Sequence, residues 1–257
     1  MNLDLAGASV LITGGSKGIG AAAARAFAAE GCNLCLVARD HAALAALQAE
    51  IAAKHAVRID IHSADLSRSE SVADLVGRWP HVDVLVNNAG AIPGGDLDAI
   101  DESRWRAAWD LKVFGYINMT RAFLSVMGRR GGGVIVNVIG LAGEMPSYDY
   151  VCGSAGNAAL MAFTRAVGGR SVDRGVRVLA VNPALTATER MVALTRTKAA
   201  ERIGDPERWR ELLTDLPLGR PASAEEIAAM VVFLASPRCG YVSGSVVTVD
   251  AGTTSRR

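Results

Sequence analysis

The sequence has few of the residues that build disulfide frameworks and metal centres. Its four cysteines are too few and too scattered for a disulfide framework in a chain of 257 residues. Cys32 and Cys35 form a CxxC pattern, but both fall within the apolar run CNLCLV, which predicts buried core thiols. The four histidines stand apart and without clustered carboxylates. We therefore expect neither a metal site nor a histidine-based catalytic triad.

The sequence also lacks a charge excess and a long apolar run. With 27 basic and 26 acidic residues, the formal net charge is +1, which does not favour nucleic acid or an anionic membrane as a partner. No apolar run approaches the roughly 18 residues that span a bilayer, and MNLDLAGASV has no basic start followed by an apolar core. We expect a cytoplasmic protein that binds small molecules or further copies of itself.

Short apolar runs alternate with alanine-rich helical stretches along the whole chain. The runs are SVLIT, CNLCLV, VRIDI, VDVLVN, GVIVNV, VRVLAV and SVVTV. They are apolar throughout, as strands covered on both faces are. The alternation predicts an α/β fold, a doubly wound (Rossmann) and mostly parallel seven-stranded sheet with helices on both faces. The length suits a single domain over residues 1–257.

Three stretches of the chain matter most for function. A long helix is predicted near Ser103 to Met127, and another within the segment Tyr148 to Ala166. The least regular part is the polar insertion at about residues 184–217, which follows the strand VRVLAV. An insertion just past the carboxyl end of a strand is typical of a ligand lid.

The segment TGGSKGIG follows the first strand and opens the first helix. Gly14 permits the sharp turn, Gly18 lets the backbone approach a pyrophosphate, and Gly20 lets the helix pack on the strand. The helix N-terminus supplies amide donors and the positive end of a dipole. This position after a strand predicts a dinucleotide site. The loop residues expected to bind the cofactor are Gly14, Ser16, Lys17, Gly18, Ile19 and Gly20.

The end of the second strand, LCLVARD, indicates which dinucleotide is bound. The strand ends at Ala38 and is followed by Arg39, with Lys17 facing it from the glycine loop. Two cations favour a 2′-phosphate, since arginine suits bidentate contact and lysine acts as a point charge. Asp40 is the counter-argument, because it could reach a ribose hydroxyl if the turn is tight. On residue type alone we favour NADP(H) over NAD(H).

Beyond the glycine loop, the chain resembles the short-chain dehydrogenase/reductase family over nearly its whole length. The matching motifs, in order, are ADL at 64–66, NNAG at 87–90, NP at 182–183 followed by Thr188, LGRPASAEEIA at 218–228 and YVSGSVVTVDAG at 241–252. The resemblance implies cofactor contacts from Asp65, Leu66, Asn87, Ala89, Gly90, Pro183 and Thr188. It also implies a homo-oligomer, a dimer or a tetramer.

The family transfers a hydride between a nicotinamide and a carbonyl or alcohol. It uses a tyrosine as acid/base, a lysine that lowers the tyrosine pKa, a serine for the substrate oxygen and an asparagine for a proton relay. The flanking motifs AALMAFTRA and WDLKVFG set the register in this chain. The four positions hold Gly153 for the tyrosine, Asn157 for the lysine, Gly140 for the serine and Lys112 for the asparagine.

The departures allow two readings of the site. In the first, hydride transfer is lost and the protein only binds a dinucleotide. In the second, the chemistry has been relocated, because lysine and asparagine have exchanged places. If the segment Tyr148 to Ala166 is helical from its start, positions 150, 153, 154 and 157 share one stripe. The candidate catalytic residues are then Tyr150, Lys112, Asn157 and Ser154.

Each candidate has an ordinary structural explanation as well. Tyr150 suits a packing role at the helix entry, and Lys112 could be a solvated helix residue. A buried Lys112 with a lowered pKa could instead be an acid/base, which also allows elimination or isomerisation beside a bound cofactor. Our hypothesis is an NAD(P)(H)-dependent oxidoreductase with an atypical active site, acting on a small-molecule carbonyl or alcohol.

Overall fold

The chain forms a seven-stranded sheet in which every neighbouring pair of strands is parallel. The computed structural model describes residues 1–256, and Arg257, the last residue of the predicted domain, lies outside them. The strand order is β3-β2-β1-β4-β5-β6-β7. The strands are β1 (Ser9–Thr13), β2 (Asn33–Ala38), β3 (Ile59–Ser63), β4 (Val84–Asn87), β5 (Gly133–Val138), β6 (Val176–Pro183) and β7 (Val246–Val249). The predicted doubly wound sheet is confirmed.

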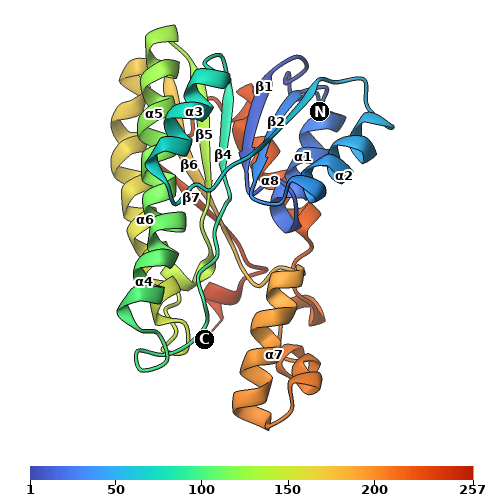
Figure 1. Ribbon diagram of the computed structural model, residues 1–257, viewed down its shortest axis with the longest axis vertical. Coiled ribbons are helices and arrows are strands. Elements are labelled where there is room, and N and C mark those ends of the chain that lie inside the picture. Colours follow the sequence, from blue (N-terminus) through green and yellow to red (C-terminus); the bar gives the residue numbers. More distant parts are fainter. Residues whose placement is uncertain (257) are drawn as a thin grey trace.

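Helices cover both faces of the sheet, as Figure 1 shows, with α1, α2 and α8 on one side and α3, α5 and α6 on the other. The helices are α1 (Gly18–Ala29), α2 (His41–Ala52), α3 (Ser69–Arg78), α4 (Glu102–Trp109), α5 (Gly115–Arg130), α6 (Val151–Ser171), α7 (Glu189–Ile203) and α8 (Ala224–Ala235). In β1, Val10 and Ile12 join one hydrophobic cluster and Leu11 joins the other. Burial on both faces explains why inner strands such as β1 are apolar throughout, whereas the edge strand β3 contains Asp60 and His62 and is only partly buried. Within residues 1–256, no helix combines the length and the apolar character needed to cross a bilayer.

The long helix predicted near Ser103 to Met127 is interrupted. A π-helical turn, Asp110–Phe114, separates α4 from α5, and Lys112 lies at its centre. Such turns are rare and are frequent at functional sites. Gly115 follows the turn, where a β-carbon would lie 3.3 Å from the carbonyl oxygen of Leu66. The chain therefore passes close to the loop after β3 at this point, a contact that no local pattern reveals.

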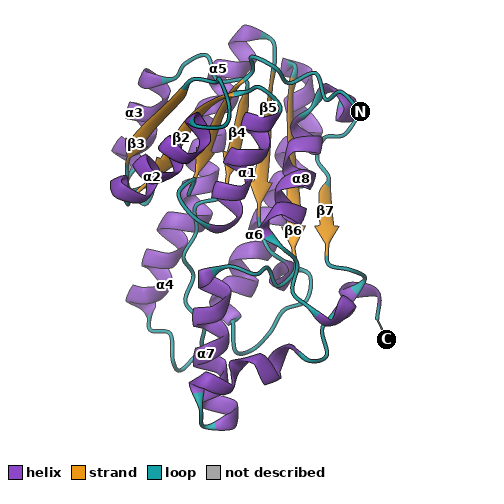
Figure 2. Cartoon of the chain, turned by 90° about the vertical axis from the view of Figure 1, so that its right-hand side faces the viewer, coloured by secondary structure: helices purple, strands orange, loops and turns teal. Residues whose placement is uncertain are grey.

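The segment predicted to be the least regular contains a helix of four turns. Thr188 caps α7, and its Oγ1 accepts a hydrogen bond from the Met191 amide at 3.2 Å. Met191, Ala199 and Trp209 form a small hydrophobic cluster that holds α7 to the turn after it. Figure 2 shows α7 beyond the edge at which the strands end. The expectation of irregular structure was wrong here, because the cap and the cluster stabilise a helix.

Candidate active site

A cavity of about 860 Å³ opens at the carboxyl ends of β1, β4, β5 and β6. The residues predicted to bind the cofactor that line it are Gly14, Ser16, Lys17, Gly18, Ile19, Arg39, Leu66, Ala89, Gly90, Pro183 and Thr188. Tyr150, Lys112 and Asn157, three of the four candidate catalytic residues, line the same cavity. Gly20, Asp65, Asn87 and Ser154 are not among the lining residues. The structure thus brings the predicted cofactor loop and the altered catalytic positions into one space.

The glycine loop has the backbone shape that a phosphate cradle needs. Gly14 and Gly18 have φ angles of +63° and +53°, in the left-handed region that favours glycine. A β-carbon on Gly20 would lie 2.2 Å from the carbonyl oxygen of Gly14. Gly20 therefore acts by packing, and the amides at the start of α1 stay open to a phosphate. The loop fits the pyrophosphate of a dinucleotide.

The NNAG segment lines the cavity through its second asparagine. Asn88 donates from Nδ2 to the carbonyl oxygens of Thr13 at 3.2 Å and Gly14 at 3.1 Å, which ties the β4 loop to the glycine loop. Asn87 is fully buried, and its Nδ2 donates to Asn137 Oδ1 at 2.9 Å. Our sequence reasoning missed Asn88, although the second amide of NNAG was a signal for it.

Asp65 lies beside the cavity but directs its carboxylate to the chain that follows it. Its Oδ1 accepts hydrogen bonds from the amide of Ser67 at 3.1 Å and from its Oγ at 2.8 Å. These bonds lower the pKa of Asp65. Ala64 and Leu66 on either side line the cavity. The adenine contact implied for Asp65 stays a prediction.

The end of the cavity beside β2 carries two cations, Arg39 and Lys17, and two carboxylates that are already engaged. Arg39 is exposed and lines the cavity with Lys17, whose Nζ lies 3.8 Å from Glu189. The Asp40 carboxylate accepts a hydrogen bond from the Ala43 amide at 3.0 Å and caps α2. Asp40, whose carboxylate could have bound a ribose hydroxyl, therefore serves as the N-cap of α2.

Lys112 extends from the π-helical turn to the end of β5. Its Nζ donates to the Ile139 carbonyl oxygen at 2.6 Å, and it lies 5.6 Å from the centroid of the Tyr116 ring. A β-carbon on Gly90 would lie 2.7 Å from Cδ of Lys112, so the lysine stem occupies the space above that glycine. Burial, and to a lesser extent the charge of Arg190, lowers the pKa of Lys112 from 10.5 to about 7.

Asn157 reaches the same end of β5 from α6. A β-carbon on Gly140 would lie 2.9 Å from Asn157 Nδ2. Asn157 is 3% exposed, and its Oδ1 is buried without a hydrogen-bond partner among the described residues. The exchanged lysine and asparagine therefore converge on Ile139 and Gly140, where the family has its serine.

Tyr150 lies over Gly153, although not for the reason that the sequence suggested. α6 begins at Val151, so Tyr150 is its N-cap residue, with φ of −146° and ψ of 36°, and the assumed helix from Tyr148 is wrong. The ring still folds back onto the first turn. A β-carbon on Gly153 would lie 2.1 Å from Cε1 and 2.2 Å from Cζ of Tyr150. The phenol occupies the space that the usual tyrosine stem would need.

Ser154 is engaged in holding the loop before α6. Its Oγ accepts a hydrogen bond from the Ser147 amide at 3.1 Å and lies 3.4 Å from the Ser147 carbonyl oxygen. Ser154 is 5% exposed and does not line the cavity. The structure therefore does not bring Ser154 together with the other three candidates.

Ion pairs join α7 to the loop before α6. The Asp149 carboxylate lies 2.8 Å from Lys198 Nζ and 2.7 Å from Arg202 Nη2. The hydrogen bonds from Lys198 and Ser147 lower the pKa of Asp149 to about 2. These pairs hold α7 to the loop before α6, beside the cavity, and the lid predicted at about residues 184–217 stays a prediction.

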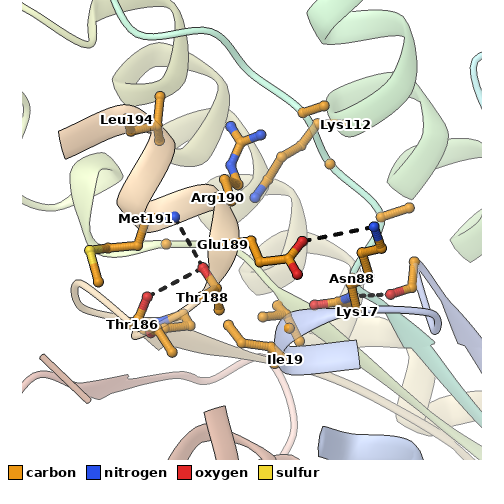
Figure 3. A pocket seen from close by; sticks show the side chains of 18 of the residues that line it. Lys17, Ile19, Asn88, Lys112, Thr186, Thr188, Glu189, Arg190, Met191 and Leu194 are labelled. Carbon is orange, nitrogen blue, oxygen red and sulfur yellow. Dashed lines mark hydrogen bonds and ion pairs between the residues drawn. The ribbon is translucent and has the colours of Figure 1, made fainter. Parts of the chain in front are cut away.

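Arg190 is a cavity residue that our sequence reasoning missed. Its Nη2 donates to the Ile92 carbonyl oxygen. Figure 3 shows the Arg190 and Lys112 side chains pointing into the same pocket. An arginine in a polar insertion carries no local signal, because only the folding of α7 over the sheet edge brings it to Lys112.

Comparison with known proteins covers nearly the whole chain. The family pattern described as short chain dehydrogenase matches residues 8–199. Galactitol 2-dehydrogenase (L-tagatose-forming) from Cereibacter sphaeroides is 36% identical over 97% of this chain and 96% of its own. A 3-oxoacyl-(acyl-carrier-protein) reductase from Synechocystis sp. is 33% identical over 94% and 95%. L-Sorbose reductase from Gluconobacter frateurii, solved with NADPH and L-sorbose, has a TM-score of 0.91 at 29% identity and covers 100% of both chains.

We expect the buried amine of Lys112 to make stability depend on pH. In the unfolded chain the lysine keeps its proton to about pH 10.5, whereas the folded protein releases it above about 7. Between these pH values the unfolded state binds more protons than the folded state. The contribution of Lys112 to the free energy of unfolding therefore rises with pH in this range. Lys112→Met removes this dependence. Urea unfolding from pH 6 to 9 measures it.

The gain in unfolding free energy of Lys112→Met over wild type should be largest at pH 6. It should shrink above pH 7 by up to roughly 1.4 kcal/mol per unit. Lys54→Met is the control, since Lys54 is exposed at the end of α2. A difference that stays constant from pH 6 to 9 contradicts the lowered pKa.

Proposed function

This chain belongs to the short-chain dehydrogenase family, and we propose that it is an NADP(H)-dependent oxidoreductase with relocated acid/base groups. Its substrate is a small-molecule alcohol or carbonyl. Relatives named galactitol 2-dehydrogenase and L-sorbose reductase support this class of substrate. In this proposal Lys112 takes the acid/base role of the absent tyrosine, and Tyr150 holds the substrate oxygen as the absent serine would.

One observation carries this proposal. Three side chains each occupy the space above a glycine. Lys112 Cδ is 2.7 Å from the β-carbon position of Gly90. Asn157 Nδ2 is 2.9 Å from that of Gly140, and Tyr150 Cε1 is 2.1 Å from that of Gly153. Two of these glycines, Gly140 and Gly153, are themselves departures from the family, and the space above them is filled by Asn157 and Tyr150 and is not left vacant.

The chemistry follows from the positions of these groups. The dinucleotide supplies hydride transfer when it is bound. Lys112, with a pKa of about 7, can give a proton to a carbonyl oxygen or take one from an alcohol at neutral pH. Tyr150 can hold the same oxygen through its hydroxyl, and the Ile139 carbonyl oxygen orients the amine at 2.6 Å. Proton transfer of this kind accelerates reactions by about 10²- to 10⁴-fold.

The cations beside β2 support NADP(H) as the cofactor. Arg39 can contact a 2′-phosphate with two parallel hydrogen bonds, and Lys17 adds a second charge. Asp40 would repel that phosphate, but its charge is directed to the α2 cap. L-Sorbose reductase, with its bound NADPH, is consistent with this choice.

The first experiment is a screen of NADPH oxidation against a panel of small carbonyl compounds. With the best substrate, Lys112→Met should lower kcat by about 100-fold or more, the lower range of acid/base catalysis. Tyr150→Phe should lower it less, by about 10-fold, because it removes one hydrogen bond. Lys54→Met should match wild type, because Lys54 is remote from the cavity.

The outcomes separate the alternatives. Turnover that neither substitution slows means that the groups have not been relocated to these residues. If NADPH binds but no compound is ever reduced, the protein is a dinucleotide-binding module. Substrate consumed at unchanged NADPH absorbance indicates elimination or isomerisation.

We expect Gly153→Ala to act through Tyr150. The added β-carbon would lie 2.1 Å from the ring and push it out of the cavity, lowering kcat by about 10-fold, as the loss of one hydrogen bond would. Alanine is the better helix former by up to about 1 kcal/mol, so the loss is not one of folding. In a Tyr150→Ala background the same change should have no further effect. Equal losses in both backgrounds contradict the contact.

Cofactor choice is tested with Arg39→Gln. The variant should bind NADPH about 10- to 100-fold more weakly, since a charge-assisted hydrogen bond is lost, and should bind NADH as wild type does. Fluorescence titration gives both dissociation constants. Arg58→Gln is the control, because Arg58 is exposed beside Asp60 and does not line the cavity. Tighter binding of NADH by the wild type would reverse the assignment.

A further inference from the structure

Arg190 and Lys112 lie at the end of the cavity that is lined by α7 and the Ile139–Gly140 segment, which we call the substrate end. Neither cation has a carboxylate partner among residues 1–256. Arg190 donates to the Ile92 carbonyl oxygen, and Lys112 donates to that of Ile139 at 2.6 Å. Within the described chain, neither forms an ion pair. Figure 3 shows both pointing into one pocket. A carbonyl dipole cannot neutralise a full charge, so both cations stay uncompensated.

The aspartates that line the cavity are used elsewhere. Asp149 binds Lys198 at 2.8 Å and Arg202 at 2.7 Å. Asp40 accepts a hydrogen bond from the Ala43 amide at the start of α2. The Asp149 charge is therefore paired with α7, and Asp40 lies at the end of the cavity beside β2, where it caps α2.

The glutamates of α7 that line the cavity do not compensate Arg190 and Lys112 either. Glu189 directs its carboxylate to Lys17, at 3.8 Å. Glu201 follows Arg190 on the same helix by roughly 16 Å, at about 1.5 Å per residue. The substrate end of the cavity therefore has a local excess of positive charge.

We propose that the substrate carries a carboxylate that binds Arg190 beside Lys112, so that the enzyme acts on an oxo acid or a hydroxy acid. This inference rests on the proposed function and names its substrate class. An anion between two cations replaces their repulsion with two attractions, and the guanidinium fork matches a carboxylate. Asn157 Oδ1, buried without a partner, can accept a hydrogen bond from the substrate hydroxyl.

The anion that binds Arg190 could also come from the cofactor, as a phosphate group. Thr188, two residues before Arg190, lines the cavity next to Gly18 of the glycine loop. A cofactor phosphate could therefore meet Arg190. The two sources differ in which ligand loses affinity when the guanidinium is removed.

The test uses malonate and its neutral diamide, malonamide, neither of which has a ketone to reduce. Calorimetry measures their binding to the NADPH-saturated protein. Wild type should bind malonate about 10-fold or more tightly than malonamide, and Arg190→Gln should abolish that preference. Arg196→Gln is the matched control on the same helix, since its guanidinium pairs with Glu207 and does not line the cavity. It should keep the preference.

Three results would overturn the proposal. One is equal binding of malonate and malonamide by wild type. Another is an equal loss of the preference in Arg190→Gln and Arg196→Gln, which would indicate general electrostatics. The third is an Arg190→Gln variant that binds NADPH about 10-fold more weakly yet keeps its malonate preference, which would assign the guanidinium to the cofactor.

The binding test is independent of turnover. If NADPH is oxidised by neutral ketones and not by oxo acids, the carboxylate proposal fails and the oxidoreductase proposal stands. If malonate binds through Arg190 and no carbonyl compound, oxo acid or neutral ketone, is ever reduced, the anion site stands and the oxidoreductase proposal fails.

Discussion

The parallel order of the strands is the constraint on which the whole site depends. Parallel strands end at one edge of the sheet, and the order reverses between β1 and β4. The loops after β1, β4, β5 and β6 therefore meet around one cavity. Each loop supplies one component: the glycine loop, Asn88, the Ile139–Gly140 segment and the start of the segment that carries α7. No single loop could form a site without the others.

Within that cavity, the altered side chains and the glycines depend on one another. Lys112, Asn157 and Tyr150 each fill the space above a glycine. A side chain restored at Gly153 would collide with the Tyr150 ring, and one restored at Gly140 would collide with Asn157. The glycines at positions 140 and 153 therefore leave room for the Asn157 amide and the Tyr150 ring, whereas Gly90, which leaves room for the Lys112 stem, belongs to a motif that the chain shares with the family.

In the absence of a ligand, the positive charges in the cavity lower the free energy of unfolding. Lys112 is partly buried, and its amine donates to a single protein carbonyl oxygen, with the Arg190 guanidinium nearby. Uncompensated charge of this kind lowers stability, and it is retained mainly where a ligand or a reaction uses it. The Asp149 ion pairs have the opposite effect, since they compensate the charges of Lys198 and Arg202 and hold α7 near the cavity.

The sequence by itself determined the architecture and the location of the cofactor loop. Apolar runs without alternation indicate buried parallel strands, and the glycine loop needs only its position after the first of them. The motif AALMAFTRA was enough to identify Gly153 and Asn157 as departures. These signals are local, since each lies within one strand, one turn or one helix.

The tertiary structure alone decided which groups meet. The π-helical turn aims Lys112 at Ile139, 27 residues away along the chain. The start of α6 at Val151 makes Tyr150 a cap residue whose ring lies over Gly153. Arg190 reaches the cavity only because α7 folds across the sheet edge. Such contacts depend on helix phase and on space between distant elements, which packing sets and no local pattern records.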